Sequence, residues 1–450
     1  MSFPRYPKYK DSGVEWLGEV PNGWDVVPLK HLASLKGRLG WQGLRADEYT
    51  EDGPFLVTSE HFANDRIDWQ RCYHVPSDRY AMAPEIQLRP DDLLMMKDGA
   101  AMGKLAFVDH LPGPACLNSH LLLFRPLNGR FANRFLYYVL SGPIFKTYMV
   151  QERTGTTFFG ISQERIGAFP FAVPPMNEQH HVLAFLDRET AKIDGLVAEQ
   201  RRLIELLKEK RQAVISHAVT KGLNPHAPMK PSGIEWLGDV PEHWEFGRVK
   251  HYFRTCSGGT PNTSMQELYY TDETGIPWVR TTDLKNGVLR EVAVFITERA
   301  LSDTACAILP PGTVMIAMYG GDGTVGKNGL LAIRAAINQA VCGLLPSPSI
   351  NSEYAFRFMQ FYRPYWMIGA ESSRKDPNIS QERVGNAPIT KPPREEQDAI
   401  VRFLDCQLRG FDALTAEAER AIDLLQERRT ALISAAVTGK IDLRKEPLDD

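Results

Sequence analysis

The feature that most constrains the fold of this chain is an internal repeat. The segment GVEWLGEVPNGW (13–24) returns as GIEWLGDVPEHW (233–244), and ISQERIGAFPFAVPPMNEQ (161–179) returns as ISQERVGNAPITKPPREEQ (379–397). LLKEKRQAVISHAVT from Leu206 likewise returns as LLQERRTALISAAVT from Leu424. Two blocks between these segments, 21–160 and 241–378, match poorly. A duplicated plan with dissimilar blocks predicts one scaffold that carries two different specificities.

The repeat also has a circular order. AAVTGKIDLRKEP, after the last matched segment, resembles HAVTKGLNPHAP, which leads into the second tryptophan motif. The C-terminus therefore ends where the N-terminus begins. We expect the termini to lie close together and the halves to be related by a pseudo-twofold axis. A length of 450 residues agrees with two or three domains.

Two long helices are predicted, at residues 177–218 and 395–436. Each follows a double proline and opens with acidic residues suited to a first helical turn. Apolar residues recur at the alternating three- and four-residue spacing of a coiled-coil seam. The predicted seam consists of Leu186, Ile193, Leu196, Leu203, Leu207 and Val214, with Leu404, Phe411, Leu414, Ala421, Leu425 and Leu432. We expect an antiparallel pair that acts as a spacer; the alternative is two helices that each pack on their own domain.

The composition excludes several classes of protein. No apolar run reaches the ~18 residues of a membrane span, and MSFPRYPKYKDSG at the N-terminus lacks the apolar core of a secretory signal, so we expect a cytoplasmic protein. The six cysteines form no CxxC pair or zinc-type cluster, which predicts no metal site. The net charge of −3 and the balance of basic and acidic residues in both variable blocks are not typical of a strongly basic nucleic-acid-binding domain.

One stretch resembles a nucleotide-binding loop. VMIAMYGGDGTVGKNG from Val314 fits GxGxxG from Gly321 and places Lys327 at the lysine of a phosphate-binding loop. Asn328 stands where that loop needs Ser or Thr, and Gly329 is a poor start for a helix. We predict a strand, a glycine turn and a second strand. The double prolines also lack the preceding Asp or Asn of an adenine methyltransferase motif, so the sequence predicts no catalytic site.

The combination of EWLGEVPNGW, ISQERIGAFPFAVPPMNEQ and EQDAIVRFLD around two variable blocks resembles the specificity subunit of type I restriction-modification systems, over the whole chain. SGGTPNTS, IPWVRTTDL and INQAVCGLLP are similar to segments of a second target-recognition domain of that family, and KGRLGWQGLRADEY to one version of a first. The resemblance implies a mixed α/β fold in which two target-recognition domains are separated by a pair of long antiparallel coiled-coil helices.

The resemblance also implies a function without catalysis. The chain would read an asymmetric, interrupted sequence in double-stranded DNA and dock methyltransferase subunits, expected to be two, with nuclease and translocase subunits in a complete restriction enzyme. S-adenosylmethionine, ATP and Mg would then bind only the partner subunits. Two alternatives stay open: a duplicated nucleotide-binding enzyme that uses residues 321–327, and a coiled-coil adaptor for two proteins.

These interpretations divide the chain into an N-terminal repeat segment (1–20), a first target-recognition domain (21–160), a first repeat region (161–240), a second target-recognition domain (241–378) and a second repeat region (379–450). Reading DNA requires donors and acceptors on loops, with basic side chains at the phosphates. The candidates are Lys36, Arg38, Trp41, Arg45, Ser59, His61, Lys97, Lys104 and Thr156 in the first domain, and Thr260, Asn262, Arg280, Thr281, Tyr319, Lys327, Arg374 and Lys375 in the second.

Overall fold

The computed structural model describes residues 3–38, 44–63, 65–127, 129, 131–155, 159–272, 274–320, 323–367 and 378–447. The chain divides into two compact units. Unit 1 contains Met1–Gln200 and Glu419–Asp450, and unit 2 contains Arg201–Ala418. Two long helices, α5 (Met176–Lys221) and α11 (Arg394–Val437), each contribute a segment to both units.

Unit 1 is built on a mixed sheet in the order β4 (Ala33–Gly37), β12 (Leu121–Pro126), β9 (Leu93–Met96), β10 (Leu105–Phe107), β7 (Arg66–Ile67), β6 (Phe62–Ala63). A second sheet has the order β11 (Ala115–Leu117), β5 (Thr50–Val57), β8 (Tyr73–His74). Strand pairs β1 (Tyr9–Asp11) with β2 (Glu19–Pro21) and β3 (Asp25–Pro28) with β13 (Pro170–Val173) complete its sheets. Its shorter helices are α1 (Ser77–Ala81), α2 (Asn133–Ser141), α3 (Pro143–Glu152) and α4 (Gln163–Ala168).

Unit 2 repeats this plan. Its main sheet has the order β17 (Thr255–Ser257), β26 (Val341–Leu344), β23 (Val314–Ala317), β24 (Asn328–Leu331), β20 (Gly287–Leu289). The second sheet has the order β18 (Tyr270–Thr271), β21 (Phe295–Ile296), β19 (Ile276–Val279), β25 (Ala335–Ile337), β22 (Ile308–Leu309). The strand pairs are β14 (Met229–Pro231) with β15 (Asp239–Pro241) and β16 (Glu245–Arg248) with β27 (Pro388–Lys391). Its shorter helices are α6 (Val249–Tyr252), α7 (Gln266–Tyr269), α8 (Glu298–Asp303), α9 (Ser352–Tyr362) and α10 (Gln381–Asn386).

The strand pairings show that the two variable blocks share a topology although their sequences match poorly. In each main sheet, four successive strands pair antiparallel, and the fourth strand then pairs parallel with a fifth. The parallel pairs are β10 with β7 and β24 with β20. Each second sheet contains one parallel pair, β5 with β11 in unit 1 and β19 with β25 in unit 2. The predicted internal repeat and mixed α/β class are therefore confirmed in the strand order of the units.

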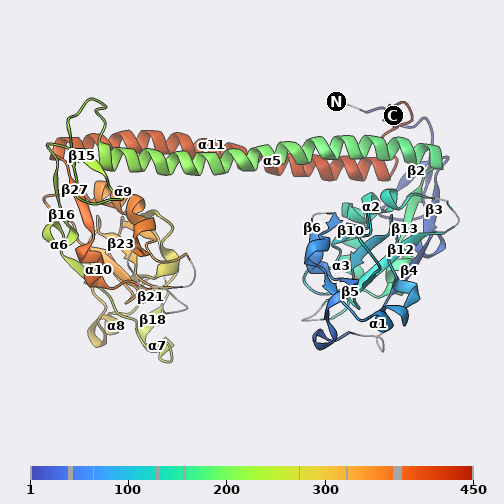
Figure 1. Cartoon of the computed structure of the whole chain (residues 1–450), viewed down its shortest axis with the longest axis horizontal. Coiled ribbons are helices and arrows are strands. Elements are labelled where there is room, and N and C mark those ends of the chain that lie inside the picture. Colours follow the sequence, from blue (N-terminus) through green and yellow to red (C-terminus); the bar gives the residue numbers. More distant parts are fainter. Residues whose placement is uncertain are drawn as a thin grey trace. The chain divides into compact units, whose positions relative to one another are not determined.

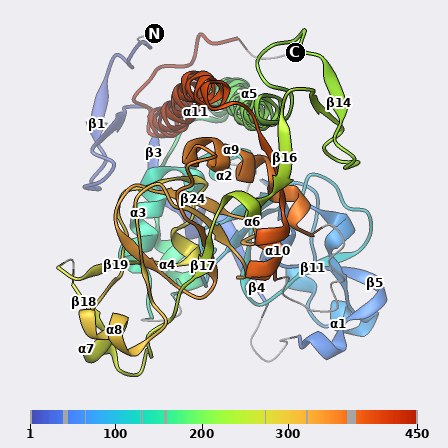
Figure 2. The same cartoon turned by 90° about the vertical axis from the view of Figure 1, so that its left-hand side faces the viewer.

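Both long helices begin directly after their double prolines, and a repeated glutamine fixes each start. The Gln179 side-chain amide donates to the Pro174 carbonyl at 2.9 Å, and its Oε1 accepts the Ala132 N–H at 3.0 Å. Gln397 makes the same pair of bonds, to the Pro392 carbonyl at 2.8 Å and from the Asn351 N–H at 2.7 Å. Each glutamine thus joins a long helix to the start of α2 or α9, which packs on the main sheet. Figure 2 shows α9 between the long helices and β24 in unit 2.

Within each unit the segments of α5 and α11 run antiparallel, as predicted (Figure 1). In unit 1 Arg429 pairs with Asp194 at 3.0 Å, whereas Glu446, beyond the end of α11, pairs with Arg188 at 2.8 Å nearer the start of α5. In unit 2 Arg211 forms an ion pair with Asp412. The alternative of two unpaired helices is therefore wrong.

The predicted seam is correct at some positions and displaced by one residue at others. Leu186, Ile193, Leu207, Leu404, Phe411 and Leu432 are buried, and Val214, Ala421 and Leu425 are half-buried. Leu196, Leu203 and Leu414 are exposed and do not belong to the seam. Val197 is buried in place of Leu196. The prediction placed the next seam residue three positions after Ile193, whereas in the helix it lies four positions after Ile193.

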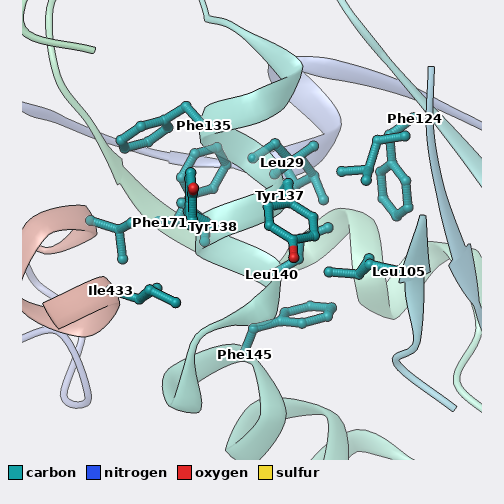
Figure 3. Packing of buried hydrophobic residues seen from close by; sticks show 14 of the residues in the cluster. Leu29, Leu105, Phe124, Phe135, Tyr137, Tyr138, Leu140, Phe145, Phe171 and Ile433 are labelled. Carbon is teal, nitrogen blue, oxygen red and sulfur yellow. The ribbon is translucent and has the colours of Figure 1, made fainter. Parts of the chain in front are cut away.

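The core of unit 1 unites segments from distant parts of the chain. Figure 3 shows members of one buried cluster that come from the sheet (Leu105 and Phe124), from α2 (Phe135), from α3 (Phe145) and from α11 (Ile433). Buried aromatic side chains of this size contribute much of the apolar area that stabilises a domain. The last turns of α11 are therefore part of the core around which the first variable block folds.

The described chain ends meet in unit 1, as the circular order predicts. The Asp442 N–H donates to the Pro4 carbonyl at 2.8 Å, and the Tyr9 hydroxyl donates to the Gly439 carbonyl at 3.1 Å. The Arg444 guanidinium lies over the ring of Tyr6. The N-terminal and C-terminal segments together thus occupy the place that one continuous linker, residues 222–244, occupies in unit 2.

Candidate nucleic-acid interface

In unit 1 the parallel pair β5–β11 brings two turns together. The Asn118 N–H donates to the Val57 carbonyl at 3.1 Å, so the turn after β11 lies beside the turn after β5. That second turn is closed by the Thr58 N–H, which donates to Nδ1 of His61 at 3.0 Å. Its tip, Ser59 and Glu60, stays accessible to solvent.

Loops of the main sheet lie beside these turns. The Lys97 N–H, just after β9, donates to the His120 carbonyl at 3.0 Å, and Nδ1 of His120 lies 2.8 Å from an oxygen of Asp98. Nζ of Lys104, just before β10, donates to the Phe62 carbonyl at 2.9 Å. We call residues 58–61, 97–99, 103–104 and 118–120 the first loop cluster.

Unit 2 has an equivalent set of loops. The Asn338 N–H donates to the Val279 carbonyl at 2.9 Å, and the Met318 N–H donates to the Ala340 carbonyl at 2.8 Å. The turn after β19 is closed by the Arg280 N–H, which donates to Asp283 at 2.8 Å. We call residues 280–283, 318–319, 326–327 and 338–340 the second loop cluster.

Although their backbones correspond, the two loop clusters expose different side chains. The first presents lysines, a glutamate and a histidine, whereas the second presents an arginine, threonines, a tyrosine and a lysine. Such mixed donors and acceptors on loops can contact base edges, and the basic side chains can contact phosphates. Equivalent loops with unlike chemistry are the arrangement expected of two readers with different targets.

A family model described as type I restriction modification DNA specificity domain matches the chain twice, at residues 21–206 and 241–423. These matches contain both variable blocks and most of both long helices. The chain belongs to this family. It is a DNA-binding specificity subunit of the type I restriction-modification class, with two target-recognition domains.

Curated relatives extend the similarity over nearly the full length. The EcoKI specificity subunit of Escherichia coli (strain K12) is 20% identical over 440 residues, which cover 94% of this chain and 90% of the relative. The MjaIX specificity subunit of Methanocaldococcus jannaschii is 24% identical over 443 residues, 96% of each protein. Low identity over such coverage is expected where the variable domains diverge.

Solved structures share the fold of this specificity subunit. A chain from a study of complex assembly and conformational transition of the type I R-M system aligns with a TM-score of 0.71 at 15% identity, covering 93% of this chain and 98% of that one. The HsdS subunit from Thermoanaerobacter tengcongensis aligns with a TM-score of 0.51 at 15% identity, covering 94% and 98%.

Several predicted DNA-binding residues of the specificity subunit come together in the loop clusters. The first cluster contains Ser59, Lys97 and Lys104, and the second contains Arg280, Thr281, Tyr319 and Lys327. Lys36 is exposed on β4 next to Gly37, the residue of β4 that faces Nζ of Lys97. Their contact with DNA stays a prediction.

Two predicted DNA-binding residues are buried, so neither side chain lies on the surface of the loop cluster. Arg38 is 4% exposed; its Nε donates to the Leu117 carbonyl at 3.0 Å and an Nη to Sγ of Cys116 at 3.2 Å. His61 is 2% exposed, and burial lowers its pKa, so the ring stays neutral and accepts the Thr58 N–H. Both side chains shape the loops from beneath, a role that residue type alone does not reveal.

The remaining predicted residues lie outside the loop clusters. Arg45 is exposed before a 3-10 turn, where its N–H donates to Glu48 at 2.8 Å. Thr260 and Asn262 are exposed on the loop after β17, and Oδ1 of Asn262 accepts from the Ser264 N–H at 3.0 Å. Four predictions fall outside the described residues: Trp41, Thr156, Arg374 and Lys375.

Glu60, His120 and Thr282 also belong to the loop clusters and are exposed, but they were not among the predicted residues. A signal was available in the duplicated order of elements. VTSEH after the apolar end of β5 corresponds to VRTTD after β19, and LNSH corresponds to INQA. Aligning those turns would have identified the exposed positions between the buried ones.

The glycine loop of unit 2 does not have the architecture of a phosphate-binding loop. The chain passes from β23 into β24, which are antiparallel neighbours, and Asn328 begins a strand where a phosphate-binding loop would begin a helix. Gly321 itself lies outside the described residues. Within the described part of the chain, no three His, Cys, Asp or Glu side chains are grouped so as to hold a metal ion, and no helix is long and apolar enough to span a bilayer.

Proposed function

We propose that this specificity subunit reads a bipartite, asymmetric DNA target in which each target-recognition domain contacts one half-site. The supporting observation is the pair of loop clusters, which have equivalent backbones and unlike side chains. Bases between the half-sites need no direct contact, so the target contains an unspecified middle. Each loop cluster is proposed to enter the groove, with lysines at its edge on the phosphates.

The long helices are proposed to set the distance between the half-sites. A helix of 46 residues such as α5 is about 69 Å long at ~1.5 Å per residue. Two readers on one face of B-DNA are separated by about 34 Å or a multiple of it. A continuous helix pair is stiff enough to enforce such a separation.

Catalysis is proposed to come from partner subunits that dock on this chain. Two methyltransferase subunits would bind S-adenosylmethionine and modify adenine, and nuclease and translocase subunits would use ATP and Mg. The balanced charge of the variable blocks supports this division, because a reader with few surplus positive charges needs other subunits to supply phosphate contacts.

An exchange of domains tests the proposal. Residues 21–160 are replaced by the corresponding block of a relative with a different target, and modified adenines are sequenced in a host that carries the chimera and its methyltransferase partner. One half of the target should change while the other half and the gap length remain. A change in both halves, or a modified sequence without a gap, would contradict modular reading.

A further inference from the structure

The turns that follow β5 and β19 are built alike but carry different charged side chains. Residues 58–61 read Thr-Ser-Glu-His, and residues 280–283 read Arg-Thr-Thr-Asp. In each turn the first N–H donates to the side chain of the fourth residue, Nδ1 of His61 or a carboxylate oxygen of Asp283. The third residue is exposed in both, and it is Glu60 in the first turn and Thr282 in the second.

A neighbouring hydroxyl group holds the Glu60 carboxylate in place. The Thr58 hydroxyl donates to its Oε1 at 3.0 Å, and the ring of Tyr73 packs edge-on against His61 of the same turn with centroids 4.9 Å apart. The Tyr73 ring is itself stacked on Tyr49 with centroids 4.9 Å apart. With 54% of the side chain exposed, the carboxylate is oriented but still has accepting capacity toward solvent.

A carboxylate in the first loop cluster would oppose phosphate binding unless it meets a donor. Lys97 and Lys104 of the same cluster suit phosphates, but Glu60 can only accept hydrogen bonds when ionised. In the major groove the donors are the exocyclic amino groups, N4 of cytosine and N6 of adenine. Adenine places the acceptor N7 beside its amino group, which would repel a carboxylate, whereas cytosine does not.

We propose that Glu60 reads a cytosine in the half-site of the first target-recognition domain by accepting a hydrogen bond from the N4 amino group of that base. This inference rests on the proposed function. Thr58 is a positioning residue, because its hydroxyl holds the carboxylate. The equivalent turn of unit 2 lacks this acceptor at its third position, so the second half-site is read by other side chains.

The test compares methylomes of hosts that carry the methyltransferase complex with wild-type chain, Glu60→Gln, Glu60→Ala or the matched control Thr282→Ala. Wild type should modify a gapped motif with a fixed C·G pair in one half-site. Both Glu60 variants should lose the preference at that pair alone, a decrease in discrimination of about 5- to 100-fold. Thr282→Ala should leave that pair fixed.

Three results would separate the inference from the function on which it rests. An unchanged first half-site in both Glu60 variants overturns the role of Glu60 and leaves bipartite reading intact. The absence of any gapped motif with wild type overturns the proposed function itself. If a Glu60 variant modifies no DNA, the purified complex is tested by competition binding to duplexes substituted at each position of the target. Discrimination lost at one base pair alone supports the inference. Discrimination lost across both half-sites contradicts it.

Discussion

At the scale of single residues, the two copies of the tryptophan motif differ in one hydrogen bond. Trp24 and Trp244 are both buried, but Nε1 of Trp24 donates to Glu178 at 2.9 Å, whereas Nε1 of Trp244 has no partner among the described residues. Glu178 also accepts from the Tyr6 hydroxyl at 3.0 Å, and burial raises the pKa of that tyrosine above its ordinary value. Tyr6 and Trp24 of the N-terminal segment are therefore both tied to α5.

Replacing each tryptophan by phenylalanine should reveal this difference. Trp24→Phe removes a hydrogen bond to a charged group, worth about 1.5–3 kcal/mol, together with some packing. Trp244→Phe removes similar packing and a donor that has no partner. We expect Trp24→Phe to cost about 1–2 kcal/mol more, measured as the loss of amide hydrogen-exchange protection in β13 compared with β27. Equal losses would show that the Glu178 contact does not contribute to stability.

At the scale of the helix, the buried residues of α5 and α11 recur at a regular spacing, and the sequence predicts only some of these positions. Ile193, Val197 and Leu207 are buried in α5, and Phe411, Thr415 and Ala418 follow the same phase in α11. Leu196 and Leu414 immediately precede two of these positions and point outward. Leucine is a common seam residue, so its presence at a three-residue step misled the prediction.

Alanine substitutions should distinguish the observed contact face of α5, which contains Val197, from the predicted seam, which contains Leu196. Val197 is 8% exposed and Leu196 is 46% exposed, so Val197→Ala should cost about 1–2 kcal/mol of helix-pair stability while Leu196→Ala costs about 0.5 kcal/mol or less. Thermal unfolding and hydrogen exchange of residues 186–200 provide the measurement. A larger cost for the bigger leucine side chain would restore the predicted seam.

The loops illustrate why much of the site escapes sequence reasoning. Composition and turn residues correctly place Ser59 and Arg280 on turns, because both follow the buried ends of strands. They do not reveal that Arg38 points inward, since that depends on carbonyl groups at the end of β11 that are distant in sequence. Strand order in the variable blocks is equally hidden, because parallel pairs such as β5 and β11 form between remote segments.

At the scale of the whole molecule, the repeat and the helix pair were predictable because each leaves a periodic trace in the sequence. The proposed spacing role makes a quantitative prediction. Inserting 22 residues, about six turns, into both α5 and α11 adds ~33 Å and should lengthen the unspecified gap by about ten base pairs, one turn of B-DNA, which keeps both readers on one face. The outer bases should not change. Methylome sequencing measures the gap directly.

An insertion in α5 alone is the control for this prediction. The insertion, placed between Asp194 and Arg211, moves these two residues of α5 apart. Their partners in α11, Arg429 and Asp412, keep their separation. The Asp194–Arg429 and Arg211–Asp412 ion pairs then cannot both form in one register of the helix pair. Modification should then be lost. A lengthened gap with the single insertion, or an unchanged gap with both, would contradict the spacing role.

The discontinuity of unit 1 has a consequence for biosynthesis. Unit 2 is contiguous, from Arg201 to Ala418, whereas unit 1 needs the segment from Glu419 onward to supply Ile433 and Val437 to its core. On the ribosome, the half of the protein that is translated first is therefore the last to be completed. A nonsense codon near the 3′ end of the gene would damage the reader encoded at its 5′ end and spare the other.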